Sequence, residues 1–353
     1  MKVGILTFHA AHNYGAVLQC YALSEYLKSL GHDVYVVDYR LKYLLKCYNW
    51  FNLSNLKKSI IHGYLIKELK TMMLKRKRGE TFKRFVSKYF RLADVSLLEN
   101  DFFDYVVIGS DQVWNTKLTN GFDRLYWGQF KHSSHTKIIS YAASLEGLWD
   151  KEYDDKIKNL FSSFSMISTR EYDVACRIKN ILQNSKIVTT CVDPTLLITD
   201  LQWNKIVDDC PIKEKYVLYY QVKQSKIGMD IARRISCKYN CKLYVLSANL
   251  NLENSPEVVI ASPEKMLGLI KNAEFVVNSS FHGTVFSVIF KKNFISISSG
   301  GKDSRVKNLL TNLNLMEHYI EGDFEDREYK TQNLKEILSK YVMSSVEYLN
   351  LIR

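Results

Sequence analysis

The first residues of the chain hold the stretch that decides its fold. Residues 3–38 read VGILTFHAAHNYGAVLQCYALSEYLKSLGHDVYVVD. Val3–Phe8 and Val34–Asp38 are strand-length runs rich in apolar residues. Between them, Ala16–Leu30 has the spacing of an amphipathic helix and ends at Gly31, a residue typical of helix C-termini. The pattern predicts a βαβ unit whose two strands are parallel, because such crossovers are right-handed.

The same alternation of strand and helix patterns continues in two successive series. The first series adds strands predicted at 105–108, 137–142, 165–168 and 187–192. The second has strands at 216–221, 242–247, 275–278 and 294–297, and helices at 227–239, 263–270, 284–290, 305–313 and 334–351. We therefore predict an α/β protein with two doubly wound Rossmann-like domains that face a cleft.

The domain boundary is predicted between residues 205 and 206. The first domain, 1–205, includes a basic helical insertion at about 42–91, and the second, 206–353, is closed by the C-terminal helix. A chain of 353 residues is long enough for two such domains.

The net charge of the chain indicates what kind of binding partner to expect. There are 49 Lys and Arg residues against 37 Asp and Glu, a formal net charge of +12. This excess favours an anionic partner or reflects a solvated basic surface. No nucleic-acid-binding module is recognisable, so we expect no nucleic acid. The basic stretch Lys67–Arg91 is interleaved with apolar residues, and either lies on an anionic membrane or is a solvated helix face.

The seven cysteines form no CxxC pair and have no histidine at metal-ligand spacing. We therefore expect no metal site and a reducing compartment. Neither a signal peptide nor a membrane-spanning apolar run is evident. The expected location is the cytoplasm, with the basic stretch available for peripheral contact at the inner face of the membrane.

Polar side chains follow several of the predicted strands at the points where those strands end. Because the carboxyl ends of parallel strands meet at one edge of a sheet, these loops are the candidate ligand-binding loops. They are His9 and His12-Asn13-Tyr14-Gly15, Gly109-Ser110-Asp111-Gln112, Ser168-Thr169-Arg170-Glu171, Asp193-Pro194, and Ser280-Phe281-His282-Gly283.

His282 is the principal catalytic candidate. It lies between a buried-strand pattern and an apolar helix, at a helix N-terminus whose unpaired N–H groups and partial positive charge attract anions. An imidazole there can titrate near neutral pH. Ser280, Gly283 and Thr284 share this turn and are candidate donor-binding residues.

The other candidates each have a structural interpretation as well. Arg170 can hold a carboxylate or phosphate in a bidentate fork, or pair with Glu171. Asp111 can act as a base, or cap the helix that follows. Asn13 can contact a substrate, or serve only as an N-cap. Lys302 and Arg305 follow a Gly300-Gly301 turn and suit phosphate, or form a solvated loop.

With these residues in view, the chain resembles the polysaccharide pyruvyl transferase family. The pieces that carry the resemblance occur in the family's order, from residue 1 to about 315. They are Asn13-Tyr14-Gly15-Ala16-Val17-Leu18-Gln19, Gly109-Ser110-Asp111-Gln112-Val113-Trp114-Asn115, Tyr141-Ala142-Ala143-Ser144, Ser168-Thr169-Arg170-Glu171, Val192-Asp193-Pro194-Thr195 and Ser279-Ser280-Phe281-His282-Gly283-Thr284.

The resemblance implies a fold similar to GT-B glycosyltransferases and transfer of a pyruvyl group from phosphoenolpyruvate to two hydroxyls of a sugar, giving a cyclic ketal. It implies a donor site containing Arg170 and His282. Some members carry an arginine two residues before the histidine, where this chain has Ser280. We therefore expect Lys302 or Arg305 to supply the second cation.

On this reading His282 is the general acid and Asp111 the base, and phosphoenolpyruvate is a substrate, so no cofactor is needed. The first domain would hold the saccharide, free or lipid-linked, for a bacterial surface polysaccharide. The expected acceptor contacts are His12, Asn13, Tyr14, Gly15 and Gln112.

Two other functions are also compatible with the sequence. One is a GT-B glycosyltransferase that uses a nucleotide sugar, for which Glu253 and Glu257 are the nearest ribose-binding candidates. The other is a carbohydrate-binding protein with no catalytic activity. The acceptor sugar, the ketal stereochemistry and the oligomeric state have no signature in the sequence.

Overall fold

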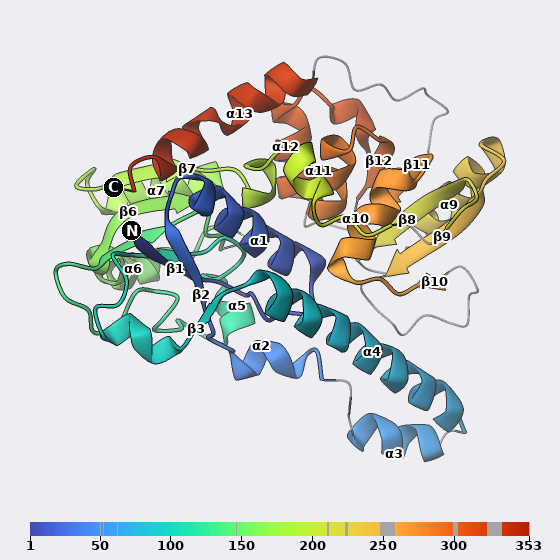
Figure 1. Ribbon diagram of the computed structural model, residues 1–353, viewed down its shortest axis with the longest axis horizontal. Coiled ribbons are helices and arrows are strands. Elements are labelled where there is room, and N and C mark those ends of the chain that lie inside the picture. The colour runs from blue at the N-terminus through green and yellow to red at the C-terminus, as the bar shows by residue number, and fades with distance from the viewer. Residues whose placement is uncertain are drawn as a thin grey trace. The chain divides into compact units, whose positions relative to one another are not determined.

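A computed structural model describes most of the chain, and it divides into two compact units (Figure 1). Unit 1 comprises Met1–Tyr48, Lys83–Ile198 and Val342–Arg353, and unit 2 comprises Asn49–Phe82 and Thr199–Tyr341. The described residues are 1–49, 51, 53–61, 63–145, 147–209, 212–222, 225–247, 258–298, 303–322 and 334–352, without the side chains of residues 53 and 55.

Unit 1 is built on a seven-stranded parallel sheet with the order β3-β2-β1-β4-β5-β6-β7. Its strands are β1 (Lys2–Leu6), β2 (Asp33–Val37), β3 (Leu92–Ala93), β4 (Tyr105–Ile108), β5 (Lys137–Ser140), β6 (Phe164–Thr169) and β7 (Ile187–Thr190). The chain order reverses between β1 and β4, so this is a doubly wound sheet with its switch point there.

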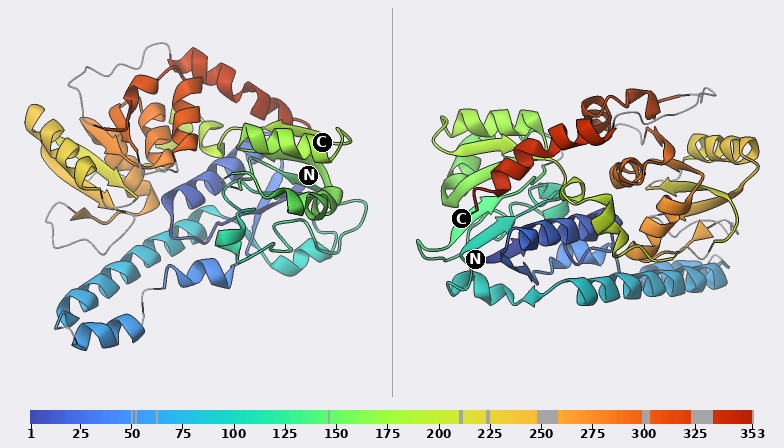
Figure 2. Two further views of the ribbon diagram at one scale, coloured as in Figure 1. Left: turned by 180° about the vertical axis from the view of Figure 1, so that it is seen from behind. Right: turned by 45° about the horizontal axis from the view of Figure 1, so that its top comes forward.

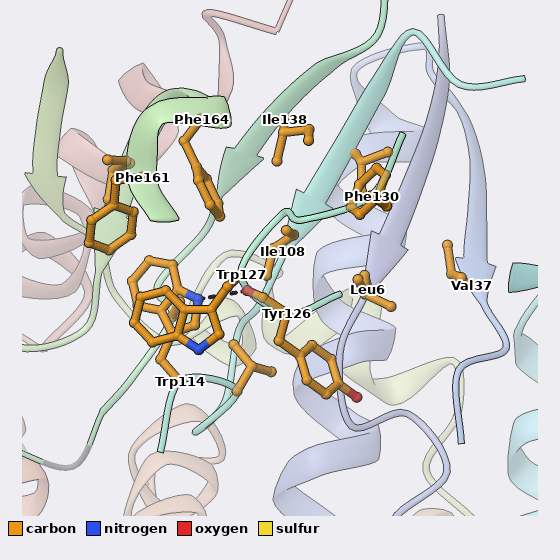
Figure 3. Packing of buried hydrophobic residues seen from close by; sticks show 14 of the residues in the cluster. Leu6, Val37, Ile108, Trp114, Tyr126, Trp127, Phe130, Ile138, Phe161 and Phe164 are labelled. Atoms are coloured by element: carbon orange, nitrogen blue, oxygen red, sulfur yellow. Dashed lines mark hydrogen bonds between the residues drawn. The ribbon is translucent and has the colours of Figure 1, made fainter. Parts of the chain in front are cut away.

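The helices of unit 1 are α1 (Tyr14–Ser29), α2 (Lys42–Lys46), α5 (Thr116–Thr119), α6 (Asp154–Leu160) and α7 (Tyr172–Ile181). Large aromatic side chains fill the core on one side of the sheet (Figure 3). Trp114 and Trp127 stack there with ring centroids 5.2 Å apart, and the Trp114 indole donates to the Tyr126 carbonyl at 2.8 Å. This packing fixes the segment that follows β4, one of the candidate loops.

Unit 2 contains a six-stranded parallel sheet with the order β10-β9-β8-β11-β12-β13. The strands are β8 (Tyr216–Gln221), β9 (Lys242–Ser247), β10 (Val258–Val259), β11 (Phe275–Asn278), β12 (Asn293–Ile297) and β13 (Tyr319–Ile320). The switch point lies between β8 and β11. The loop that carries His282 follows β11, so it leaves the sheet at this point.

The helices of unit 2 are α3 (Leu53–Ile61), α8 (Asp200–Asn204), α9 (Lys226–Lys238), α10 (Pro263–Asn272), α11 (Phe281–Ile289) and α12 (Ser304–Asn312). Two helices cross from one unit to the other, namely α4 (Leu65–Tyr89) and α13 (Leu334–Leu349). In the views of Figures 1 and 2, α3 lies beside the first turns of α4. Among the described residues, no helix combines the length and apolar character needed to cross a bilayer.

The expected α/β class with two parallel sheets is confirmed. The expected domain bounds, 1–205 and 206–353, stay a prediction. In the division into compact units, Asn49–Phe82 and Thr199–Tyr341 form unit 2, and Val342–Arg353 belongs to unit 1. The helical insertion at 42–91 is three helices divided between the units. The two-residue strands β3, β10 and β13 were not expected.

Candidate active site

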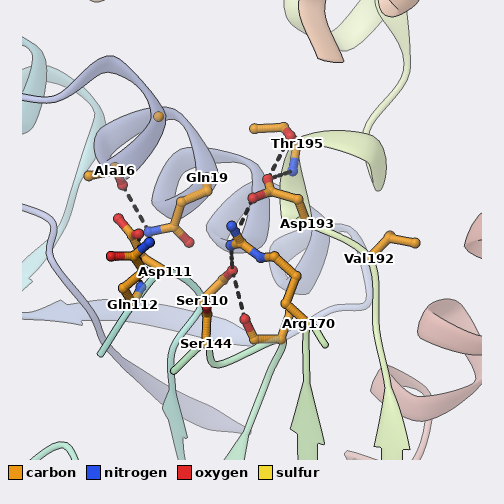
Figure 4. A network of polar contacts seen from close by, with 12 residues as sticks. Ala16, Gln19, Ser110, Asp111, Gln112, Ser144, Arg170, Val192, Asp193 and Thr195 are labelled. Carbon is orange, nitrogen blue, oxygen red and sulfur yellow. Dashed lines mark hydrogen bonds and ion pairs between the residues drawn. The ribbon is translucent and has the colours of Figure 1, made fainter. Parts of the chain in front are cut away.

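Arg170, directly after β6, is the centre of a polar network in unit 1 (Figure 4). Its guanidinium forms a 2.8 Å ion pair with Asp193, and the two side chains are 5% and 0% exposed. The same guanidinium donates to the Ser110 hydroxyl. The Asp193 carboxylate also accepts from the Thr195 amide at 3.0 Å and from the Thr195 hydroxyl at 2.6 Å. The charge of Arg170 is therefore balanced inside the protein.

A second chain of hydrogen bonds ties this network to helix α1. The Gln19 amide donates to the Ala16 carbonyl at 2.8 Å and to the Thr7 hydroxyl at 3.1 Å, and Thr7 donates to the Ser110 carbonyl at 2.7 Å. Gln19 and Thr7 are fully buried. The network thus links the loops after β1, β4, β6 and β7, whose carboxyl ends share one edge of the sheet.

The C-terminal residues support the same loops. The Ser345 hydroxyl accepts from the Val192 amide at 2.9 Å, and the Tyr348 hydroxyl donates to the Ser140 carbonyl at 2.8 Å. Both bonds are buried. The end of α13 therefore holds the segment next to Asp193 in place, a role that the sequence did not reveal.

The carboxylate that pairs with Arg170 is that of Asp193, whereas the structural interpretation of its sequence position named Glu171. Glu171 instead accepts a hydrogen bond from the Ser144 hydroxyl, and Asp193 takes the place of the carboxylate partner. Arg170 is followed by Glu171 in sequence, but their side chains make different contacts because consecutive residues at a strand end point in different directions.

Asp111 does not cap a helix, which was one interpretation of its position. Helix α5 begins five residues later, with Asn115 as its N-cap. The Asp111 carboxylate accepts from the Gln112 amide at 2.8 Å, and its φ of 78° lies in the left-handed region that non-glycine residues rarely adopt. Gly109 before it has φ 107°, where a Cβ would lie 2.7 Å from the Tyr141 carbonyl oxygen. Strained backbone of this kind is frequent at functional sites.

The expected acceptor contacts around α1 differ in accessibility. Asn13 is the N-cap of α1, and its side chain accepts from Gly15 at 2.9 Å, which confirms the capping role. Tyr14 and Gly15 are buried, and the half-buried His12 lies beside Tyr48 with ring centroids 5.3 Å apart. Gln112 is also buried and accepts from Asn115 at 3.3 Å. A role of any of these five in acceptor binding stays a prediction.

His9 is a buried histidine that was noted only as part of a loop. Its Nε2 lies 3.0 Å from an Asp38 carboxylate oxygen, and Arg40 donates to the same oxygen at 2.7 Å. Burial lowers the pKa of His9, although the Asp38 carboxylate opposes this shift. Burial raises the pKa of Asp38, but the hydrogen bonds from Arg40 and His9 outweigh it and leave that pKa below its usual range.

In unit 2, helix α11 begins three residues earlier than expected, so His282 is its second residue. Ser280 is the N-cap, and its hydroxyl accepts from the Gly283 amide at 3.3 Å. Thr284 is fully buried and donates to Asn278 at 3.0 Å. The predicted helix N-terminus is confirmed, and Ser280 and Thr284 shape it.

Gly283 lies in close contact with Tyr220 at the end of β8. A Cβ on Gly283 would be 2.9 Å from a ring carbon of Tyr220 and 3.1 Å from the Asn278 Cβ. Burial raises the pKa of Tyr220, while a hydrogen bond with the Ser280 side chain and the charge of Arg78 act in the opposite direction. The absence of a side chain at 283 therefore lets Tyr220 pack on the first turn of α11.

Arg78 of α4 is a residue that the sequence reasoning missed as a candidate. It is buried, its guanidinium lies 5.6 Å from the Phe82 ring centroid, and its charge acts on Tyr220. In the sequence it belongs to the run Lys75-Arg76-Lys77-Arg78, of which it alone is buried. The sequence does not show which arginine or lysine of a basic run is buried, because burial depends on tertiary packing.

Arg305 of α12 is the second arginine near the first turn of α11. Its guanidinium lies 5.7 Å from the ring centroid of Phe281, and that ring meets His282 edge to face at 5.1 Å. Asp303 before it is buried and accepts from Ser298 at 2.7 Å and Tyr319 at 3.0 Å. Of the two expected cations, Arg305 thus lies over the ring of Phe281, the residue before His282, and Lys302 lies outside the described residues. Glu253 and Glu257, raised for the glycosyltransferase alternative, also lie outside them.

Within the described residues, no group of three or more His, Cys, Asp or Glu side chains is arranged to hold a metal ion. The expectation that no metal site is needed predicts that turnover is unchanged in the presence of a chelator.

Comparison with known proteins identifies the family. Residues 13–301 match the family model described as polysaccharide pyruvyl transferase. An uncharacterized MCM-type protein of Methanocaldococcus jannaschii is 26% identical over 213 residues, which are 59% of this chain and 26% of that protein. The chain therefore spans about a quarter of that relative.

Solved structures are similar only at low identity. A UDP-N-acetylglucosamine 2-epimerase from Rickettsia bellii is 12% identical with a TM-score of 0.47, covering 99% of this chain and 97% of that one. An E. coli heptosyltransferase with ADP is 12% identical with a TM-score of 0.41, covering 99% and 100%. The family model spans most of the chain, including the loops around Arg170 and His282, and on this evidence the chain belongs to the polysaccharide pyruvyl transferase family.

Proposed function

We propose that this protein transfers a pyruvyl group from phosphoenolpyruvate to two hydroxyls of a saccharide, forming a cyclic ketal in a bacterial surface polysaccharide. The observation that carries the proposal is the first turn of α11. His282 in this turn lies within the family match, and Arg305 lies over the ring of the preceding Phe281. The charge of Arg78 acts on Tyr220, which is in close contact with Gly283 of the same turn.

The donor explains why cations are needed at this turn. Phosphoenolpyruvate carries a carboxylate and a phosphate, and arginine is suited to both. Some members of the family have an arginine at the position of Ser280. Here Arg78 and Arg305 would supply that charge, and the N–H groups at the start of α11 would bind phosphate oxygens. Ser280 would cap the donor-binding turn, and Gly283 would let Tyr220 pack against it.

The reaction is redox-neutral. A proton is added to the methylene carbon of phosphoenolpyruvate, and one saccharide hydroxyl attacks C2. The C2–O bond to phosphate then breaks, and the second hydroxyl attacks C2 and closes the ketal. The two hydroxyl protons are balanced by the new methyl hydrogen and the released phosphate. We assign the proton delivery to His282 and removal of a hydroxyl proton to Asp111, steps that each contribute roughly 10²–10⁴-fold.

Arg170 has a different role in this proposal. Its guanidinium already contacts Asp193 and Ser110, so it would bind donor only while keeping those contacts. Lysine at this position retains the charge but loses the planar fork. Arg170→Lys is therefore expected to weaken donor binding with a smaller loss of stability than Arg170→Ala.

The product identifies the reaction. We would incubate the protein with phosphoenolpyruvate and bacterial surface saccharides, measure released phosphate, and look for a mass increase of one pyruvyl group. His282→Asn should abolish most of the turnover, whereas His135→Asn, at an exposed histidine paired with Asp104, should not. Thermal stabilisation by a nucleotide diphosphate but not by phosphoenolpyruvate would contradict the proposal and support the glycosyltransferase alternative. Binding of saccharide alone, with no turnover, would support the non-catalytic one.

A further inference from the structure

The helices α3 and α4 present a group of exposed apolar side chains that the proposed reaction does not use. We call them the α3–α4 surface. Ile61, Ile66 and Met73 are 77%, 72% and 71% exposed. The complete set is Ile60, Ile61, Tyr64, Ile66, Leu69, Met73 and Leu74. Contiguous exposed apolar groups of this kind mark interaction sites.

The turn between the two helices brings these residues together. Gly63 has φ +73°, and the Tyr64 amide donates to the Ser59 carbonyl at 2.9 Å, which ends α3 and reverses the chain. Ile60 and Ile61 therefore precede the turn directly, and Ile66 follows it. In Figures 1 and 2, the first turns of α4 lie beside α3.

The exposed apolar residues of α4 lie on a different face of the helix from the residues that it buries. Ile66, Leu69 and Met73 have i, i+3, i+7 spacing and share one face. The buried residues Thr71, Met72, Arg78, Gly79 and Phe82 lie on the opposite face. α4 thus buries one face within the protein and presents apolar side chains to solvent on the other.

The charge around this surface is strongly positive. Residues 53–84 contain ten Lys and Arg residues against two Glu. Lys70 and Lys77 are exposed on the same side of α4 as Ile66 and Met73, and Lys67 is exposed at the margin of that side. A second copy of the chain would place like charges against one another, whereas an anionic surface would be attracted.

We propose that the α3–α4 surface docks on an anionic lipid membrane, with its apolar residues entering the interface and its lysines contacting lipid phosphates. An exposed apolar stripe bordered by lysines is the arrangement of helices that lie in the membrane plane. The inference does not depend on the proposed reaction, since lipid binding can be measured without donor or acceptor.

Vesicle flotation tests it directly. Full-length protein is mixed with vesicles of phosphatidylcholine alone or of phosphatidylcholine with phosphatidylglycerol. Wild type should float with the anionic vesicles, remain unbound with neutral ones, and lose binding as salt is raised. Ile61→Ser/Ile66→Ser/Met73→Ser should reduce the bound fraction at least tenfold. Lys67→Gln/Lys70→Gln/Lys77→Gln should weaken binding by about fivefold for each lysine removed.

Leu201→Ser is the matched control, because Leu201 is 74% exposed on α8 but lies outside the surface. It should bind like wild type, and all variants should keep the thermal midpoint of wild type. The proposal is overturned if wild type does not float with anionic vesicles, or if the triple serine variant floats equally well. It is also overturned if the protein dimerises through this surface and the serine substitutions abolish the dimer without any effect on lipid binding.

Discussion

The two units have the same strand order around their switch points but hold their candidate arginines in different ways. In unit 1, Arg170 is paired with the carboxylate of Asp193, with both side chains almost fully buried. In unit 2, Arg78 and Arg305 lie over the aromatic rings of Phe82 and Phe281. Loss of either partner from the buried Arg170–Asp193 pair leaves an uncompensated charge, so Arg170 has a large structural role. Substitution of Arg170 should therefore change stability as well as donor binding, and Arg78 and Arg305 provide the comparison in unit 2.

The largest expected effect is on catalysis in unit 2. His282→Asn should lower turnover by roughly 10²–10⁴-fold, because it removes a general acid. The free energy of unfolding should stay within about 0.5 kcal/mol of wild type, since the substitution is at a half-buried position in the first turn. Steady-state phosphate release and urea unfolding measure the two quantities. Turnover near the wild-type value would remove His282 from the mechanism.

Stability of unit 1 should depend strongly on the ion pair. Arg170→Ala leaves the Asp193 carboxylate buried without its partner, and we expect a loss of about 3–5 kcal/mol in the free energy of unfolding. Arg170→Ala/Asp193→Asn should recover part of that loss, because no uncompensated charge remains. Urea unfolding of both variants gives the result. A loss below about 1 kcal/mol in the single variant would contradict the contrast between the units.

In unit 2, a methyl group at position 283 should lower stability more than a methyl group at the uncrowded position 322. Gly283→Ala would force a Cβ to within 2.9 Å of Tyr220, so we expect a loss of about 1–3 kcal/mol and weaker donor binding. Gly322→Ala is the control, because a Cβ there meets nothing within 4 Å. Thermal unfolding compares the two. Equal stability of both variants would mean that Tyr220 does not pack on α11 as described.

A smaller effect is expected from His9 in unit 1. Its pKa is lower in the folded state than in the unfolded chain, so the unfolded state binds more protons as pH falls through 6.5. The contribution of neutral His9 to the free energy of unfolding should therefore be fully present above pH 6.5 and decrease below that pH. His9→Gln cannot titrate, and its thermal midpoint should depend less on pH between about 7 and 5. An unchanged pH dependence would show that burial of His9 is not coupled to stability.

The sequence was informative where an apolar run ended at polar residues. Tyr105–Ile108, Tyr216–Gln221 and Phe275–Asn278 were located to the residue for this reason. The strand Leu92–Ala93 was missed because two residues have no periodicity. The start of α11 was placed too late, since Phe281 and His282 resemble a loop until Ser280 is recognised as the cap.

The site was harder to predict, because its contacts join residues far apart in the chain. The roles of Arg170 and His282 in binding or catalysis stay predictions. The position of Arg170 after a strand and that of His282 at a helix N-terminus were both predicted from the sequence. The partner of Arg170 was not predicted, because Asp193 lies in the segment after β7, whereas Glu171 is adjacent to Arg170 in sequence. Arg78 was hidden in a basic run, and only packing distinguishes it from its exposed neighbours.

The most direct test of the account is whether phosphoenolpyruvate binding depends on the arginines of unit 2. We would measure the thermal midpoint with and without the donor for wild type, Arg78→Gln, Arg305→Gln and the control Arg76→Gln, which removes an exposed ion pair with Glu80 on the same helix. A ligand at 100 times its Kd stabilises by about 2.7 kcal/mol. We expect a clear shift in wild type and Arg76→Gln that is strongly reduced in both other variants. A full shift in Arg78→Gln and Arg305→Gln would contradict it.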